Sequence, residues 1–256
     1  MPKRLPKVSH KKIPETDAIF AQVNTVNRLA DQDETVLRVS MDAKAGVKIG
    51  TYSRGGTNRI EVKASDHDFK PKEVLTPVGL FLPQSDDFFM YMVKSRVTAD
   101  CLVDCLHQWW DSVRKRFTHI KTLVINLDNG PENHSRRTQF MKRLLEFAKL
   151  SGLTIRLAYY PPYHSKYNPV ERCWGILENY WNGALLDSVE AVLRFAANMT
   201  YNRKHPVVEL VTTTYNTGVK LSTKAMGLLE TLIQRLPQLE KWFVDIPPVS
   251  LPDWDI

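Results

Sequence analysis

Apolar side chains recur at helical spacing in several stretches of the chain. The clearest stripe lies in residues 98–117, where successive large apolar residues are three or four positions apart and therefore share one helix face. Its members are Leu102, Leu106, Trp109, Val113 and Phe117. The same kind of spacing predicts further helices at about 16–30, 135–150, 169–182, 188–203 and 223–236.

Short apolar runs bounded by turn residues predict strands at 36–42, 78–82, 88–93, 122–128 and 154–159. Strands come first along the chain and then alternate with helices. That order predicts an α/β fold, a mixed sheet flanked by helices. Residues 206–256 show no clear pattern beyond one helix.

Two of the predicted strands end in aspartate, at Asp42 and Asp128. Side chains alternate along a strand, so each aspartate lies on the face opposite the main apolar set. If the strands are parallel neighbours, both carboxylates emerge at the edge where α/β sheets bind ligands. Two plainer interpretations stay open: either aspartate caps a turn or helix, and Asp128-Asn129-Gly130 resembles a hairpin turn.

Glu171 begins the helix predicted at 169–182. Asn168 is a good N-cap residue, Pro169 suits the first helical position, and Glu171 then stands where a capping box places its acidic residue. Capping is at least as strong an interpretation as catalysis here. The two roles are compatible if the first turn of the helix points its carboxylate at the strand ends.

Asp42, Asp128 and Glu171 can form one carboxylate cluster, whose oxygens suit hard divalent cations such as Mg²⁺. Two metals held in this way promote phosphoryl transfer on nucleic acid. The acidic triplet Asp66-His67-Asp68 is expected to lie in a loop, without a catalytic role.

Charge agrees with a polyanionic partner. The chain has 256 residues and a formal net charge of +7. Five basic and no acidic residues fall in 1–12, and eight basic and two acidic residues fall in 134–172. Positive charge is therefore concentrated at the N-terminus and around two of the candidate carboxylates, a pattern that suits a polyanion approaching an acidic site. A solvated basic face is the plainer interpretation of charge alone.

The stretch 159–167 places aromatic and basic residues just before Glu171. Lys166 and His164 are candidate phosphate contacts, whereas Tyr159 is expected to pack on the core. Cys101, Cys105 and Cys173 are too few and too unevenly spaced for a disulfide framework, and they predict small core residues in a reducing cytosol. No apolar run is long enough for a membrane span, and the basic start lacks the apolar stretch of a secretory signal.

Four stretches together resemble the DDE transposases of bacterial insertion sequences, in particular the ISAzo-type, or Rhodopirellula-type, group. They are Val39-Ser40-Met41-Asp42-Ala43-Lys44, Asp66-His67-Asp68-Phe69, the run from Asn126 to Asn133, and the run from Tyr160 to Arg172. The resemblance covers roughly residues 10–220, and its last stretch is the most specific.

The resemblance implies an RNase H-like, retroviral-integrase-like core: a five-stranded mixed sheet with helices on both faces. It implies that Asp42, Asp128 and Glu171 bind two Mg²⁺ or Mn²⁺ ions and catalyse cleavage of transposon ends and their joining to target DNA. Arg136, Arg137, His164, Lys166 and Arg172 are the expected DNA contacts. Relatives act on DNA as dimers or larger assemblies, so a homodimer in the cytoplasm, associated with the nucleoid, is expected.

Full-length relatives also carry a helix-turn-helix region that recognises terminal repeats. About 35 residues precede the first strand here, too few for such a region, so the chain is expected to lack it, as a truncated copy would. The expected division is a basic arm and linker helix in 1–30, a catalytic domain in 31–205 and an extension in 206–256. The alternatives are a non-catalytic DNA-binding remnant or another RNase H-like nuclease.

Overall fold

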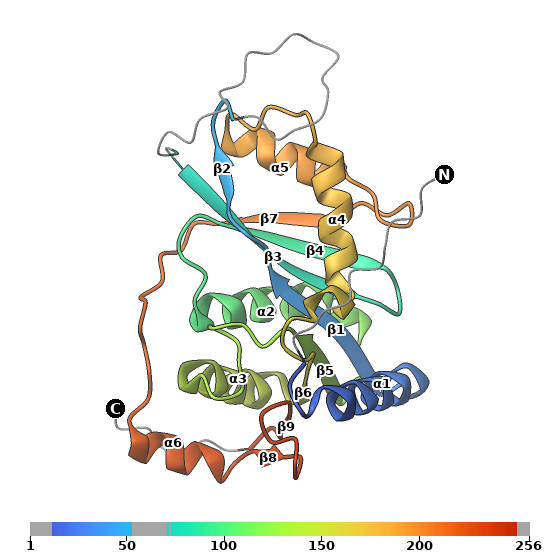
Figure 1. Cartoon of the computed structure of the whole chain (residues 1–256), viewed down its shortest axis with the longest axis vertical. Helices are drawn as coiled ribbons and strands as arrows, with labels where there is room; N and C mark the ends of the chain where they lie inside the picture. The colour runs from blue at the N-terminus through green and yellow to red at the C-terminus, as the bar shows by residue number, and fades with distance from the viewer. Residues whose placement is uncertain (1–11, 53–70, 72, 250–256) are drawn as a thin grey trace.

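The fold is built around one mixed sheet (Figure 1), seen in a computed structural model that describes residues 12–52, 71 and 73–249. Its strands are ordered β7-β4-β3-β1-β5-β6-β9-β8, and β2 pairs with β3. The strand bounds are β1 Val36–Ala43, β2 Val47–Ile49, β3 Glu73–Leu82, β4 Asp87–Val93, β5 Thr122–Leu127, β6 Thr154–Tyr159, β7 Val207–Val211, β8 Gln234–Arg235 and β9 Phe243–Ile246.

Helices cover both faces of this sheet. Their bounds are α1 Thr16–Gln32, α2 Ala99–Val113, α3 Thr138–Ser151, α4 Val170–Trp181, α5 Val189–Asn198 and α6 Thr223–Glu230. On one face, α4 and α5 bury a core that includes Phe81 and Met90. On the other, α2 and α3 bury a core that includes Leu80 and Val93. The alternation of side chains along β3 and β4 thus supplies both cores.

Each helix predicted from apolar spacing is present, and three of them end several residues earlier than predicted. The helix predicted at 188–203 ends at Asn198. The helix predicted at 98–117 ends at Val113 and continues as a 3₁₀ turn, Arg114–Arg116. The helix predicted at 223–236 ends at Glu230, because the chain then enters β8 and pairs with β9. The stripe in α2 is buried except for Phe117, which lies beyond the helix and is partly buried.

The sheet is wider than the expected five strands. The strands β4, β3, β1, β5 and β6 form its centre, as expected. The segment after residue 206 adds β7 parallel to β4 at one edge, and β9 antiparallel to β6 with β8 beyond it at the other. These added strands are two to five residues long, too short to show a clear alternating pattern.

Several expectations concern parts of the chain outside the described residues: most of the basic arm, Asp66-His67-Asp68 and the end of the chain from residue 250. Within the described part, no helix is both long and apolar enough to cross a bilayer. All three cysteines are free thiols and buried, as expected for core residues.

Candidate active site at the carboxyl ends of β1 and β5

The carboxylates of Asp42 and Asp128 are brought to one edge by the pairing of β1 with β5. These strands are parallel neighbours, with Ser40 opposite Asn126. Asp42 and Asp128 each lie two residues beyond that pair. The hairpin alternative for Asp128 is wrong, because β5 leads through a loop into α3 and its other neighbour, β6, is parallel.

Asp42 is a buried carboxylate, 8% exposed. Burial raises its pKa to about 6, and repulsion from Asp128 and, more weakly, from Glu171 adds to the rise. A hydrogen bond from the Trp174 indole opposes the rise without cancelling it. Asp128 and Glu171 therefore both lie within electrostatic reach of Asp42.

Asp128 also shapes the loop that follows its strand. Its Oδ1 accepts hydrogen bonds from the Gly130 amide and from Asn133 Nδ2, each at 3.1 Å. Asn129, between Asp128 and Gly130, has a φ of 63°, in the left-handed conformation that asparagine tolerates. The turn-capping interpretation of Asp128 is thus correct, and it leaves the second carboxylate oxygen outside these two hydrogen bonds.

The start of α4 is anchored by strand β1 and not by a capping box. No side chain caps α4 at Pro169. Instead Ser40 Oγ accepts from the Val170 amide at 2.9 Å and donates to Asn168 Oδ1 at 2.5 Å. Asn168 Nδ2 in turn donates to the Met41 carbonyl at 3.2 Å. The first turn of α4, which carries Glu171, is therefore fixed to the residues just before Asp42.

Trp174 makes the second attachment of α4 to the sheet. Its Nε1 donates to Asp42 Oδ2 at 2.9 Å. The ring lies over Gly79, the β3 residue paired with Asp42: a Cβ on Gly79 would come within 2.6 Å of Trp174. Only glycine leaves room for the indole at this distance, so Gly79 permits the contact that holds α4 beside Asp42.

The carboxylates match a divalent cation in donor chemistry, since all supply oxygen. In the described part of the chain, however, no three His, Cys, Asp or Glu side chains stand close enough to share an ion. One further feature favours a polar ligand nearby. Asn133 is 6% exposed and its Oδ1 has no hydrogen-bond partner. That oxygen flanks Gly130 together with Asp128 Oδ1. A buried acceptor without a partner is costly, and water or a hydrated cation would relieve it.

The expected DNA contacts differ in their surroundings. Arg136 is exposed, in the loop between Asp128 and α3. Arg137 forms an ion pair with Glu132 at 3.1 Å, which neutralises its charge locally. Arg172 is exposed on α4 and hydrogen-bonds Tyr201.

Lys166 is exposed and lies over the Tyr167 ring, 5.1 Å from its centroid. His164 is only 6% exposed. Its Nδ1 is 2.8 Å from the Pro162 carbonyl, and Phe20 meets its ring edge-on. Burial leaves His164 little surface for a phosphate, so its position favours shaping the loop. Tyr159 is fully buried and donates to the Asn133 carbonyl at 2.6 Å, which confirms its core position.

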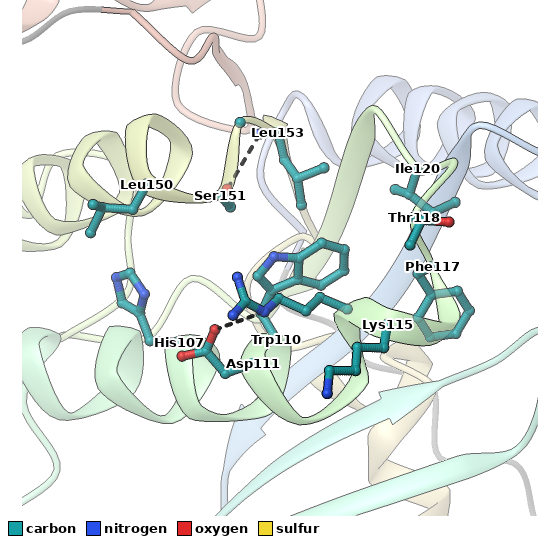
Figure 2. A pocket seen from close by; sticks show the side chains of 12 residues that line it. His107, Trp110, Asp111, Lys115, Phe117, Thr118, Ile120, Leu150, Ser151 and Leu153 are labelled. Atoms are coloured by element: carbon teal, nitrogen blue, oxygen red, sulfur yellow. Dashed lines mark hydrogen bonds and ion pairs between the residues drawn. The ribbon is translucent and has the colours of Figure 1, made fainter.

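A pocket lies at the other end of the strands, near the amino ends of β5 and β6 (Figure 2). It holds about 550 Å³ between the C-terminal ends of α2 and α3, and His107, Trp110 and Leu153 are among the residues lining it. None of the predicted site residues lines it. The carboxylate edge, and not this pocket, is therefore where the candidate chemistry lies.

Sequence reasoning missed four residues of the candidate site: Ser40, Gly79, Asn133 and Trp174. Trp174 belongs to the apolar stripe of α4, which correctly predicts its burial but hides its polar contact. Gly79 interrupts a strand, a recognised sign of close approach by another group. Ser40 and Asn133 fall inside the motifs that carry the family resemblance, although no local pattern distinguishes them.

Comparison with known proteins gives one family and a set of structures. The profile of the Rhodopirellula transposase DDE domain family matches residues 3–248. No curated protein sequence matches the chain. The structure is similar to a Mos1 transposase paired-end complex with the left transposon end, with a TM-score of 0.51 at 10% identity, covering 76% of this chain and 57% of that one. A Mos1 mariner paired-end complex with Mn gives a TM-score of 0.51 at 11% identity, with coverages of 76% and 57%.

At such low identity these similarities concern the fold alone. They confirm the predicted RNase H-like arrangement of a mixed sheet between helices. The chain spans 57% of the length of these two Mos1 chains.

Proposed function

This chain belongs to the Rhodopirellula transposase DDE domain family, and from that premise we propose that it cuts DNA at transposon ends and joins those ends to target DNA. The proposal is supported by the position of the buried Asp42 carboxylate: its strand pairs with the strand before Asp128, Trp174 of the Glu171 helix donates to it, and both acidic residues lie within its electrostatic reach. Like charges gathered in a partly buried site call for a cation.

Asp42, Asp128 and Glu171 would hold two Mg²⁺ or Mn²⁺ ions through carboxylate oxygens. When bound, such ions activate the attacking hydroxyl and stabilise the leaving 3′-oxygen in an in-line displacement. The chain's own part is to fix the ligands. The pairing of β1 with β5 sets the positions of Asp42 and Asp128, whereas the position of Glu171 depends on how α4 is attached.

DNA would approach this edge along exposed basic side chains. Three basic side chains are exposed in the segments that bear or adjoin Asp128 and Glu171: Arg136, Lys166 and Arg172. Basic side chains of this kind contact DNA phosphates. Arg137 would reach phosphate by exchanging its ion pair with Glu132 for one with DNA, and the buried His164 would shape the loop. The active assembly would be a homodimer on DNA in the cytoplasm, near the nucleoid.

We retain residues 31–205 as the catalytic unit, preceded by the basic arm and linker helix and followed by residues 206–256. Strands β7, β8 and β9 of that last segment extend the same sheet. They would brace the edges of the catalytic unit.

The proposal is tested by nicking of a supercoiled plasmid that carries the element's ends, in Mg²⁺, Mn²⁺ or EDTA. Asp128→Ala is compared with the wild type and with Asp111→Ala, an exposed aspartate that pairs with Arg114. We expect metal-dependent nicking by the wild type and by Asp111→Ala, and its loss in Asp128→Ala. DNA binding without nicking by the wild type would instead identify a non-catalytic remnant.

A further comparison separates transposition from other reactions of this fold. Transposon-end duplexes, RNA–DNA hybrids and four-way junctions are offered in equal amounts. Preference for transposon ends is the expected result. Preference for a hybrid or a junction would replace the proposal with a ribonuclease H or a junction resolvase.

A further inference from the structure

A hydroxyl-lined hollow lies beyond β1 along the edge of the sheet that bears the carboxylates. It holds about 660 Å³ where β3, β4 and the segment after β7 meet. Its lining includes Thr76, Lys94, Arg96, Thr212 and Thr214. Among the described residues that line it there is no aspartate or glutamate. We call this group the 76–96–214 hollow.

Strand register places the hollow on the same edge as Asp42. Ala43 at the end of β1 pairs with Val78 of β3, and two residues earlier in β3, Thr76 pairs with Val93. Val93 in turn pairs with Val211 at the end of β7. Neighbouring strands are about 4.8 Å apart, so the hollow begins roughly 10–15 Å from Asp42. In Figure 1 the segment after β7 runs down one side of the molecule toward α6.

The charge of the hollow suits an anion. Arg96 is exposed and makes no ion pair in the described part of the chain. Lys94 pairs with Glu73 at 2.8 Å, yet its side chain stays 37% exposed. Thr212 and Thr214 are exposed beside them. Arginine, lysine and hydroxyl side chains are the groups that contact DNA phosphates and sugars.

The hollow is also linked to the loop that carries Asp128. Glu132 of that loop accepts a hydrogen bond from the Ala99 amide at the start of α2, at 3.2 Å, and another from Arg137, also at 3.2 Å. Arg96 precedes Ala99 by three residues. One contact therefore joins the loop of Asp128 and Arg136 to the start of α2, three residues beyond Arg96.

We propose that the 76–96–214 hollow binds the phosphate backbone of duplex DNA next to the phosphodiester that reacts. This inference rests on the proposed function, because it takes the position of the reacting phosphate from the carboxylates. With a rise of 3.4 Å per base pair, the contact falls roughly three to four base pairs from that phosphate. It reads no sequence, since phosphates carry none.

The test measures binding of labelled duplexes by fluorescence anisotropy in EDTA, over a range of salt concentrations. Arg96→Ala and Lys94→Ala remove charge from the hollow, and Thr214→Val removes a hydroxyl without changing charge. Arg28→Ala is the matched control: Arg28 is exposed on α1 and donates a hydrogen bond to Gln32 on the same helix. Thermal unfolding verifies that each variant is folded.

For Arg96→Ala we expect binding to weaken from a few-fold to about tenfold on every duplex sequence, with a salt slope smaller by about one unit. Thr214→Val should weaken binding less, and Arg28→Ala not at all. The difference should disappear on duplexes cut to about two base pairs beyond the reacting phosphate on the side that faces the hollow. Trimming each side in turn identifies that side.

Equal binding by Arg96→Ala and Arg28→Ala on long duplexes would overturn the inference, and so would a difference that survives trimming on both sides. Plasmid nicking by the wild type in Mg²⁺ is measured in parallel. If nicking needs Asp128 but Arg96→Ala does not affect binding, the proposed function stands and the DNA contact at the hollow is rejected. Weaker binding by Arg96→Ala without any nicking by the wild type keeps the hollow as a DNA-backbone site, and removes both the catalytic proposal and the placement of the hollow beside a reacting phosphate.

Discussion

Trp174 Nε1 donates a hydrogen bond to Asp42 Oδ2 at 2.9 Å, across 132 residues of sequence. Trp174 lies on the same helix as Glu171, three residues further along. One hydrogen bond therefore ties the helical carboxylate to the strand carboxylate. Gly79 makes it possible, because a larger residue there would occupy the space of the indole.

Trp174→Phe should lower the stability of the protein by more than the change in packing explains, and it should also slow nicking. The substitution leaves a buried carboxylate oxygen without its donor, at a cost of about 1–3 kcal/mol in the free energy of unfolding. The hydrogen bond lowers the pKa of Asp42, so its loss should raise that pKa further. We expect slower nicking, with the acid limb of its pH profile moved to higher pH.

Trp109→Phe is the matched control for that variant. Trp109 is fully buried in α2, and its Nε1 has no partner in the described structure. Its replacement should cost stability through lost packing without moving the pH profile of nicking. An equal pH shift in both variants would contradict the role given to Trp174.

Gly79→Ala and Gly175→Ala should change stability in opposite directions. On Gly79, a Cβ would lie 2.6 Å from two carbons of Trp174, and overpacking of this kind costs about 1–3 kcal/mol. On Gly175 in α4, a Cβ would meet nothing within 4 Å, and alanine favours a helix by up to about 1 kcal/mol. Chemical denaturation measures both, and a stabilising Gly79→Ala would show that the indole does not lie there.

Asp42→Asn should stabilise the metal-free protein at neutral pH. Because the pKa of Asp42 in the folded chain is about 6, above its ordinary 3.8, the folded state binds the proton more tightly than the unfolded state. Its stability is therefore greatest below pH 3.8 and falls as pH rises toward 6. The loss amounts to about 2–3 kcal/mol at 1.36 kcal/mol per pKa unit, and asparagine avoids it.

The measurement is denaturant unfolding in EDTA between about pH 3 and about pH 8, a range that includes both the ordinary and the raised pKa of Asp42. The advantage of Asp42→Asn should be absent near the acid end and constant above about pH 7. Added Mg²⁺ should then stabilise the wild type more than the variant, because ligand binding to the folded state adds stability. If Asp42→Asn were less stable than the wild type at about pH 7.5, that result would contradict the raised pKa of Asp42.

Ser40→Ala should detach the start of α4. It removes the acceptor of the Val170 amide and the donor to Asn168 Oδ1, both of which are buried. Two buried groups without partners cost about 2–4 kcal/mol together. In a double-mutant cycle with Asn168→Ala, measured by unfolding, we expect a coupling energy of about 1 kcal/mol or more. Strictly additive losses would show that the two side chains act independently.

The local pattern of the sequence determined much of this structure. Alternation in residues 36–42 and 122–128 placed Asp42 and Asp128 at strand ends, and helical spacing located every helix of the described chain. These features depend on residues a few positions apart, so periodicity reveals them. The parallel pairing of β1 with β5 was a condition of that prediction, and the register of Ser40 with Asn126 meets it.

Only the tertiary structure decided how Glu171 reaches the strands. Its position follows from contacts of Ser40 with Asn168 and of Trp174 with Asp42, which join residues 128 and 132 positions apart. Local pattern carries no information about which distant side chains will meet, and a capping box was the equally good local solution. The strands after residue 206 were hidden for a related reason: they are short and take their conformation from the strands β4 and β6 beside them.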